Sequence, residues 1–224
     1  MSITSWGPGE GPRDKLLERG AVALSDAELL AVLLHTGYRN CSALDLARNL
    51  LIQFRGLAGV MAAEQACLQA CPGVGAGKFA VLQAALELAR RQALQAISAG
   101  DALTSPQETR RFLHYHLGAR GREVFTCLFL DNQHRVLRCE DLFLGTLDGA
   151  AVYPREVVVR ALQYHAAAVI FAHNHPSGVA EPSSADRRIT ERLCSALALL
   201  DIRVLDHIII GRGEAFSFAE AGLL

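Results

Sequence analysis

The stretch from residue 172 to residue 186, AHNHPSGVAEPSSAD, runs from an apolar segment to the start of a helix and decides how the second half of the chain folds. The residues just before the histidines, AAAVIFA, are typical of a short buried strand. In an extended segment, residues two apart point to the same side. His173 and His175 can therefore share one metal ion while Asn174 faces away.

The end of the same stretch starts the next helix. Pro182 precedes the sequence SSAD, in which Ser183 and Asp186 have the spacing of a capping box, and a capping box needs no metal. From the first helical turn, the carboxylate of Asp186 can also turn back toward the end of the strand. Two imidazoles and one carboxylate leave one tetrahedral position open for water, which is the pattern of a catalytic zinc site. The residues alone leave both interpretations open.

Around this stretch, the hydrophobic pattern alternates between strands and helices. Strands are predicted over residues 121–131, 135–146, 166–172, 203–211 and 215–218, and helices over 154–164 and 183–200. The first two strands form a hairpin around the turn DNQH. The alternation predicts the α/β (α+β) class, with a sandwich in which helices flank a mixed sheet.

The first half of the chain follows a helical pattern instead. Over residues 13–91, helices are joined by short loops; one begins at the capping box SDAE before LLAVLL and is expected to stop at Gly37, and a second runs over 42–54. Gly100 and Pro106 mark a linker. The sequence thus predicts a small helical domain over residues 1–98 and an α/β domain over 104–224.

A glycine-rich segment, PGVGAGK, lies at residues 72–78 of the helical half. It is not a phosphate-binding P-loop, because proline stands at position 72 and Phe79 replaces the Ser or Thr that would contact magnesium. It fits a helix-hairpin-helix loop, in which backbone N–H groups face a DNA phosphate. Gly73 and Gly75 are expected to need conformations that alanine resists, and Lys78 to add positive charge. Plain packing of two helices is the alternative.

Composition limits the classes of function. About half of the 224 residues are hydrophobic, and the formal net charge is −1, so bulk charge does not hold the chain on nucleic acid. No apolar stretch approaches the roughly 20 residues needed to span a bilayer, and the amino terminus has no signal-peptide pattern. We expect a cytoplasmic protein without a membrane partner. Its six cysteines form no CxxC pair and are expected to be reduced.

The motif HNHPSGVAEPSSAD has the metal signature of the JAMM (JAB1/MPN) metalloprotease family: His-x-His, seven residues, Ser, two residues, Asp. The phrases YPREVVVRAL, ITERL, VLDHIIIGRGE and LSDAELLAVLLHTG resemble the RadC branch of that family, so the resemblance covers nearly the whole chain. It implies a JAMM/MPN sandwich related to the cytidine deaminase fold. It also implies one Zn²⁺ per chain, held by His173, His175 and Asp186, and hydrolysis of a peptide or isopeptide amide.

The family also requires a glutamate on an early strand. Glu123 matches that position, and Glu140 and Glu156 are its rivals. Glu123 would act as the general base, and Ser183 would donate a hydrogen bond to the oxyanion. His207 is interpreted first as a packed or edge histidine, and second as a hydrogen-bonded partner that orients a metal ligand.

Two hypotheses from different classes follow. The first is a zinc-dependent hydrolase that takes a peptide or protein substrate. The second is a DNA repair or recombination protein that binds DNA through Gly73, Gly75 and Lys78, and whose metal domain is regulatory, inactive or a nuclease. A peptide substrate fits the second half and DNA fits the first. The sequence determines neither the substrate nor the oligomeric state.

Overall fold

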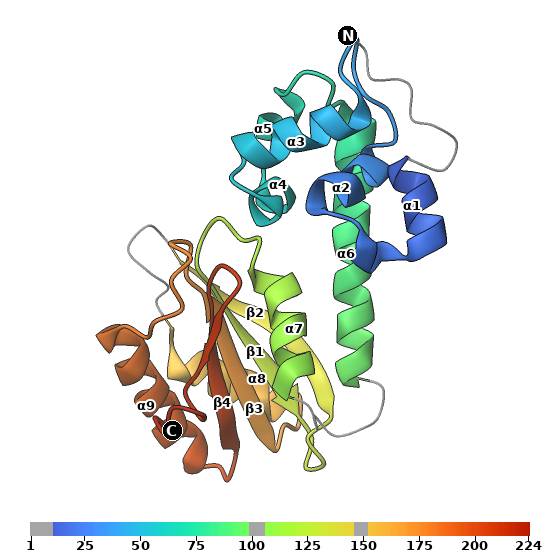
Figure 1. Cartoon of the computed structure of the whole chain (residues 1–224). Helices are drawn as coiled ribbons and strands as arrows, with labels where there is room; N and C mark the ends of the chain where they lie inside the picture. Colours follow the sequence, from blue (N-terminus) through green and yellow to red (C-terminus); the bar gives the residue numbers. More distant parts are fainter. Residues whose placement is uncertain (1–10, 99–105, 146–151) are drawn as a thin grey trace. The chain divides into compact units, whose positions relative to one another are not determined.

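A computed structural model describes residues 11–98, 106–145 and 152–224 of the chain (Figure 1). The chain divides into two compact units, Met1–Leu88 and Ala89–Leu224, so the division falls inside a long helix. The linker expected around Gly100 and the beginnings of both predicted domains lie outside the described residues.

The first unit is helical. Its elements are α1 (Pro12–Arg19), the short 3-10 helix η1 (Ala21–Ala23), α2 (Asp26–Leu34), α3 (Ala43–Gln53), α4 (Leu57–Ala62), α5 (Gln65–Gln69) and the beginning of α6 (Ala76–Ser98). A capping box starts α2, as the sequence SDAE predicts, and a second one starts α3. One hydrophobic core joins α2, α3, α4, α5 and the beginning of α6, and its buried leucines include Leu30, Leu34, Leu50, Leu68 and Leu82.

The second unit is built on a five-stranded sheet with the order β2-β1-β3-β4-β5. The strands are β1 (Val124–Leu130), β2 (Val136–Leu144), β3 (Ala168–Asn174), β4 (Arg203–Ile210) and β5 (Ala215–Ser217). β3 and β4 are parallel, and the other neighbouring pairs are antiparallel. Every residue of β1 and β3 is buried, as expected for strands covered on both faces.

Helices cover both faces of this sheet, which gives three layers (Figure 1). On one face, Phe112, Leu113 and Leu117 of α7 (Pro106–Leu117) pack against the even-numbered residues of β1 and β3. On the other face, α8 (Pro154–Gln163) and α9 (Ser184–Ala198) pack against the odd-numbered residues. The crossover from β3 to β4 contains α9, so the loop after β3 leads directly into its first turn.

The predicted fold class is confirmed: a helical region precedes a mixed sheet with flanking helices. One local expectation is wrong. The first capped helix ends at Leu34 rather than near Gly37, because His35 takes a positive φ of 61° and turns the chain. Between Pro106 and residue 121, where the sequence pattern predicts no element, the structure forms α7 (Pro106–Leu117).

Candidate metal centre

His173 and Asn174, the last two residues of β3, point to opposite faces of the sheet. The His173 ring lies on the face that carries α9 and is almost fully buried. On the other face, the Asn174 side-chain oxygen accepts a hydrogen bond from the Val124 N–H (2.9 Å), and its amide group donates to the carbonyl oxygens of Arg120 and Arg122. Asn174 therefore faces away from the histidines, as predicted, and ties the end of β3 to the start of β1.

The carboxylate of Asp186 takes part in two sets of contacts at once. Its Oδ2 accepts the Ser183 N–H at 2.7 Å, and Ser183 Oγ accepts the Asp186 N–H at 3.1 Å, which completes a capping box at the start of α9. The same carboxylate lies 3.3 Å from His173 Nε2 and 3.5 Å from His175 Nε2. Helix capping and contact with the histidines are therefore not alternatives, because the Asp186 carboxylate does both.

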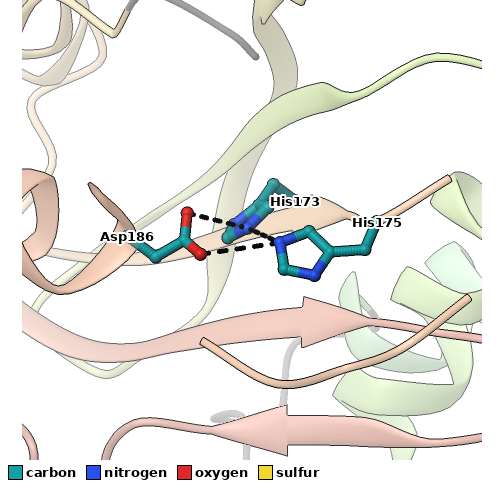
Figure 2. Close-up of side chains that lie close together, drawn as sticks. All are labelled: His173, His175 and Asp186. Atoms are coloured by element: carbon teal, nitrogen blue, oxygen red, sulfur yellow. Dashed lines mark hydrogen bonds and ion pairs between the residues drawn. The ribbon is translucent and has the colours of Figure 1, made fainter. Parts of the chain in front are cut away.

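The three side chains point toward one another, as Figure 2 shows. The two Nε2 atoms of His173 and His175 are 3.0 Å apart. Asp186 Oδ1 lies 3.3 Å from His173 Nε2, and Asp186 Oδ2 lies 3.5 Å from His175 Nε2. Zinc bonds of about 2.0–2.1 Å in a tetrahedron place neighbouring ligand atoms about 3.3 Å apart. The donor set and its spacing therefore fit one tetrahedral metal ion.

The orientation of the His175 ring is set by a backbone carbonyl. Its Nδ1 lies 2.8 Å from the carbonyl oxygen of Val179, and because a carbonyl only accepts, this nitrogen carries the proton of the neutral ring. Nε2 is then left with a free lone pair toward Asp186. Hydrogen bonding to Asp186 raises the pKa of His175 against the effect of burial, and Val179 and Glu123 raise it further.

The Asp186 carboxylate supplies negative charge to this cluster. Burial alone would raise the pKa of Asp186, but hydrogen bonds with His173, His175 and Ser183 outweigh burial and lower the pKa below its usual range. Asp186 is therefore ionised at neutral pH. Anionic oxygen and neutral imidazole nitrogen are the ligand forms that a divalent metal requires.

Glu123 lies directly before β1, beside this cluster. Phe125 pairs with His173 in the antiparallel register of β1 and β3. Glu123 lies two residues before Phe125, so the alternation of an extended segment puts it on the same face as the two histidines. Its charge contributes to the raised pKa of His175. The backbone of Glu123 is held by β2, because its carbonyl oxygen accepts the Gly145 N–H at 2.8 Å.

The two rival glutamates have other partners. Glu140 accepts a hydrogen bond from the Tyr164 hydroxyl (2.7 Å), and Arg160 Nε lies 3.6 Å from its carboxylate. Glu156 is in the first turn of α8, where Arg155 forms an exposed ion pair with it at 3.2 Å. Of the three glutamates, Glu123 is the one whose charge acts on a histidine of the cluster.

His207 hydrogen-bonds to a histidine of the cluster. The first interpretation of His207, as a packed or edge residue, did not include this contact, whereas the second interpretation did. It is fully buried on β4, and its Nε2 lies 2.8 Å from His173 Nδ1. Its Nδ1 lies 2.6 Å from Thr190 Oγ1 on α9. Burial lowers the pKa of His207 well below its ordinary value. Thr190, which carries no sequence signal of its own, lies four residues after Asp186 and so one helical turn further along α9.

The glycine loop of the first unit has a structural explanation. Gly73 has a φ of +90°, and a Cβ there would lie 2.5 Å from the Cβ of Tyr38, so glycine is required. Gly75 was expected to need such a conformation too, but this is wrong: its φ is not positive, and a Cβ at this position would meet open space. The ammonium group of Lys78 donates to the carbonyl oxygens of Gly73 (2.8 Å) and Gly37 (3.2 Å).

Two further expectations concern the whole chain. Cys41, Cys67, Cys71, Cys127, Cys139 and Cys194 are all free thiols, as predicted. Across residues 11–98, 106–145 and 152–224, none of the helices combines the length and the apolar character needed to cross a membrane.

Comparison with known proteins gives two family matches. Residues 103–223 match the RadC-like JAB domain, and residues 3–80 match the UPF0758 N-terminal domain. UPF0758 proteins from Tolumonas auensis, Nitrosococcus oceani and Thioalkalivibrio sulfidiphilus are 57%, 58% and 58% identical to this chain. Each alignment covers the whole of both proteins. The similarity therefore extends over the helical unit as well as over the sheet with its cluster.

Proposed function

Because the chain belongs to the RadC-like JAB domain family and to the UPF0758 proteins, we propose that it is a zinc-dependent hydrolase that cleaves a peptide or isopeptide amide. One observation supports this proposal above the others. His173 and His175 offer two nitrogens 3.0 Å apart, and each faces one oxygen of the Asp186 carboxylate, at 3.3 Å and 3.5 Å. Three such protein ligands leave the fourth tetrahedral position for water or substrate.

The first chemical role belongs to the metal and to Glu123. Bound to these three ligands, zinc supplies Lewis acidity, which lowers the pKa of water and polarises a carbonyl group. Glu123, on the same face as His175, takes the proton of the attacking water and later delivers it to the leaving amine. Glu123 thereby acts as general base and then as general acid at one position.

Ser183 has the second role. Its side chain is exposed at the start of α9, and its hydroxyl oxygen accepts the Asp186 N–H at 3.1 Å. The Ser183 side chain also hydrogen-bonds to the Asp186 carboxylate, and rotation of its hydroxyl group would turn the proton toward the oxyanion of the substrate. The helix cap and the oxyanion contact use different parts of one hydroxyl group.

Hydrolysis of a peptide library by the zinc-loaded protein tests this proposal. Glu123→Gln keeps the shape of the side chain but cannot accept a proton, so turnover should fall by roughly 10²–10⁴-fold while zinc stays bound. Glu140→Gln is the matched control, since Glu140 is held by Tyr164, and it should retain turnover. Equal activity of Glu123→Gln and the wild type would exclude Glu123 as the base. No cleavage of any peptide by the wild type would count against the hydrolase itself.

A further inference from the structure

A chain of three hydrogen bonds starts at one proposed metal ligand and ends at another. It runs from His173 Nδ1 to His207 Nε2 (2.8 Å), from His207 Nδ1 to Thr190 Oγ1 (2.6 Å), and from Thr190 Oγ1 to the backbone carbonyl oxygen of Asp186 (2.6 Å). β3, β4 and α9 each contribute to it. The two nitrogens of His207 are thus both engaged, with one partner each.

The direction of every proton in this chain follows from its last member. The carbonyl oxygen of Asp186 only accepts, so the single hydroxyl proton of Thr190 is donated to it. Thr190 Oγ1 must then accept from His207, which places the ring proton of His207 on Nδ1. A neutral imidazole has one such proton, so His207 Nε2 accepts from His173 Nδ1. In the neutral ring of His173, Nε2 is consequently left without a proton, and it is the atom that faces Asp186 and His175.

The surroundings of His207 keep this chain free of competing partners. Its ring is 0% exposed and lies among the rings of Phe125, Phe171 and Phe218, with centroid distances of 5.5, 6.0 and 4.9 Å. Aromatic rings neither replace Thr190 as an acceptor nor admit bulk water to the two nitrogens. From Nδ1 of His207, the hydrogen-bonded path therefore runs through Thr190 to the Asp186 carbonyl oxygen.

We propose that His207 and Thr190 are positioning residues that hold His173 in the tautomer whose Nε2 can bind a metal. His175 obtains the same tautomer directly from the Val179 carbonyl, whereas His173 obtains it through two side chains. The consequence for zinc affinity rests on the proposed function, but the position of the proton on His173 does not. Because the chain ends on the backbone of Asp186, it also couples the first turn of α9 to β3.

Replacing Thr190 by valine should move the ring protons of His207 and His173 to their other nitrogens. Thr190→Val keeps the branched shape of the side chain but leaves the Nδ1–H of His207 without an acceptor in a dry site. His207 then keeps a hydrogen bond only if its proton moves to Nε2, from which it donates to His173 Nδ1. That arrangement puts the proton of His173 on Nε2, where it blocks the metal lone pair. Thr190→Ser keeps the hydroxyl group and should keep the original arrangement.

Nitrogen-15 NMR of the histidine rings in the metal-free full-length protein measures this directly. The wild type and Thr190→Ser should show His173 protonated at Nδ1, and Thr190→Val should show its proton moved partly or wholly to Nε2. Thr126→Val is the matched control, because it removes a buried hydroxyl on β1 that contacts Asp141 and should leave His173 unchanged. If Thr190→Val does not fold, His207→Leu replaces it: leucine fits the apolar site but removes the acceptor for the Nδ1–H of His173, so the proton of His173 should again move to Nε2. An unchanged Nδ1–H on His173 in these variants would overturn the proposal.

Zinc affinity, measured by competition with a chelator, gives the second readout. Thr190→Val should bind zinc roughly 10–100-fold more weakly than the wild type, while Thr190→Ser and Thr126→Val should match it. Equal affinity of Thr190→Val and the wild type would count against the positioning role. A wild type that binds no zinc would overturn the proposed function alone, because the NMR measurement needs no metal.

Discussion

At the residue scale, Asp186 shows why a short motif is ambiguous. The spacing Ser-x-x-Asp satisfies the rule for a helix cap, and the same spacing belongs to the JAMM signature. In the structure one carboxylate accepts the Ser183 N–H and also faces His173 and His175. Stability and metal binding therefore depend on different properties of Asp186: its hydrogen-bonding oxygen for the cap, and its charge for the metal.

Asp186→Asn and Ser183→Ala should separate these two properties. Asn can still cap the helix, so Asp186→Asn should keep most of the stability but bind zinc at least roughly 10-fold more weakly, because the ligand loses its negative charge. Ser183→Ala should lose about 1 kcal/mol of unfolding free energy and keep its zinc. Urea unfolding and chelator competition on both variants check this. Full zinc affinity in Asp186→Asn would remove Asp186 from the ligand set.

The residues of the cluster differ in how far sequence alone identifies them. His173 and His175 are close in sequence, so strand geometry alone places them on one side. His207 and Thr190 reach His173 only because β4 lies parallel to β3 and α9 packs on both strands' shared face. Residue spacing within one segment cannot predict such a contact, because it depends on how separate elements pack. A buried polar residue on the strand after a metal loop was the one signal available.

At the scale of elements, strong local chemistry predicted the structure well. β1 is mostly apolar, β3 is apolar up to His173, and α2, α3 and α9 begin at Ser-x-x-acid capping boxes. α7 was not predicted, because its sequence, PQETRRFLHYHL, is mostly polar and its first residue, Pro106, is also a linker residue. Its buried face forms only against the sheet, where Phe112, Leu113 and Leu117 pack. Tertiary packing rather than intrinsic preference stabilises this helix.

The glycine loop before α6 gives a prediction at this scale. Gly73→Ala should lower the free energy of unfolding by at least about 1 kcal/mol, because its positive φ and the close Tyr38 side chain exclude a Cβ. Gly75→Ala is the matched control, because a Cβ there meets open space, and it should lower that free energy less than Gly73→Ala does. Urea titrations of the two variants decide this. Equal destabilisation by both would mean that the loop conformation described here is wrong.

The cap of α2 should make stability depend on pH. The backbone N–H of Ser25 and the ammonium group of Lys15 lower the pKa of Glu28 from 4.5 to about 2. Because the folded-state pKa is depressed, Glu28 stabilises the protein above pH 4.5 and loses this effect as the pH falls toward about 2. The wild type should exceed Glu28→Gln in unfolding free energy near neutral pH, and the difference should shrink through this window. A difference that is constant down to about pH 2 contradicts the assignment.

At the scale of the whole molecule, the proposed hydrolase activity of the second unit has more support than the predicted DNA binding of the first. The second unit matches the RadC-like JAB domain and contains the His173, His175 and Asp186 cluster. The first matches the UPF0758 N-terminal domain, and its Lys78 holds the glycine loop through two carbonyl groups. DNA binding by that loop stays a prediction, whereas the hydrolase proposal rests on chemistry that the second unit itself presents.

The zinc content of the purified full-length protein after dialysis, measured by elemental analysis, bears on that chemistry most simply. We expect about one zinc per chain in the wild type, because three ligands with an open position bind one ion. His114→Ala is the matched control on α7 and should retain that zinc, while the double variant His173→Ala, His175→Ala should lose it. As much zinc in the double variant as in the wild type would contradict a metal centre at the end of β3.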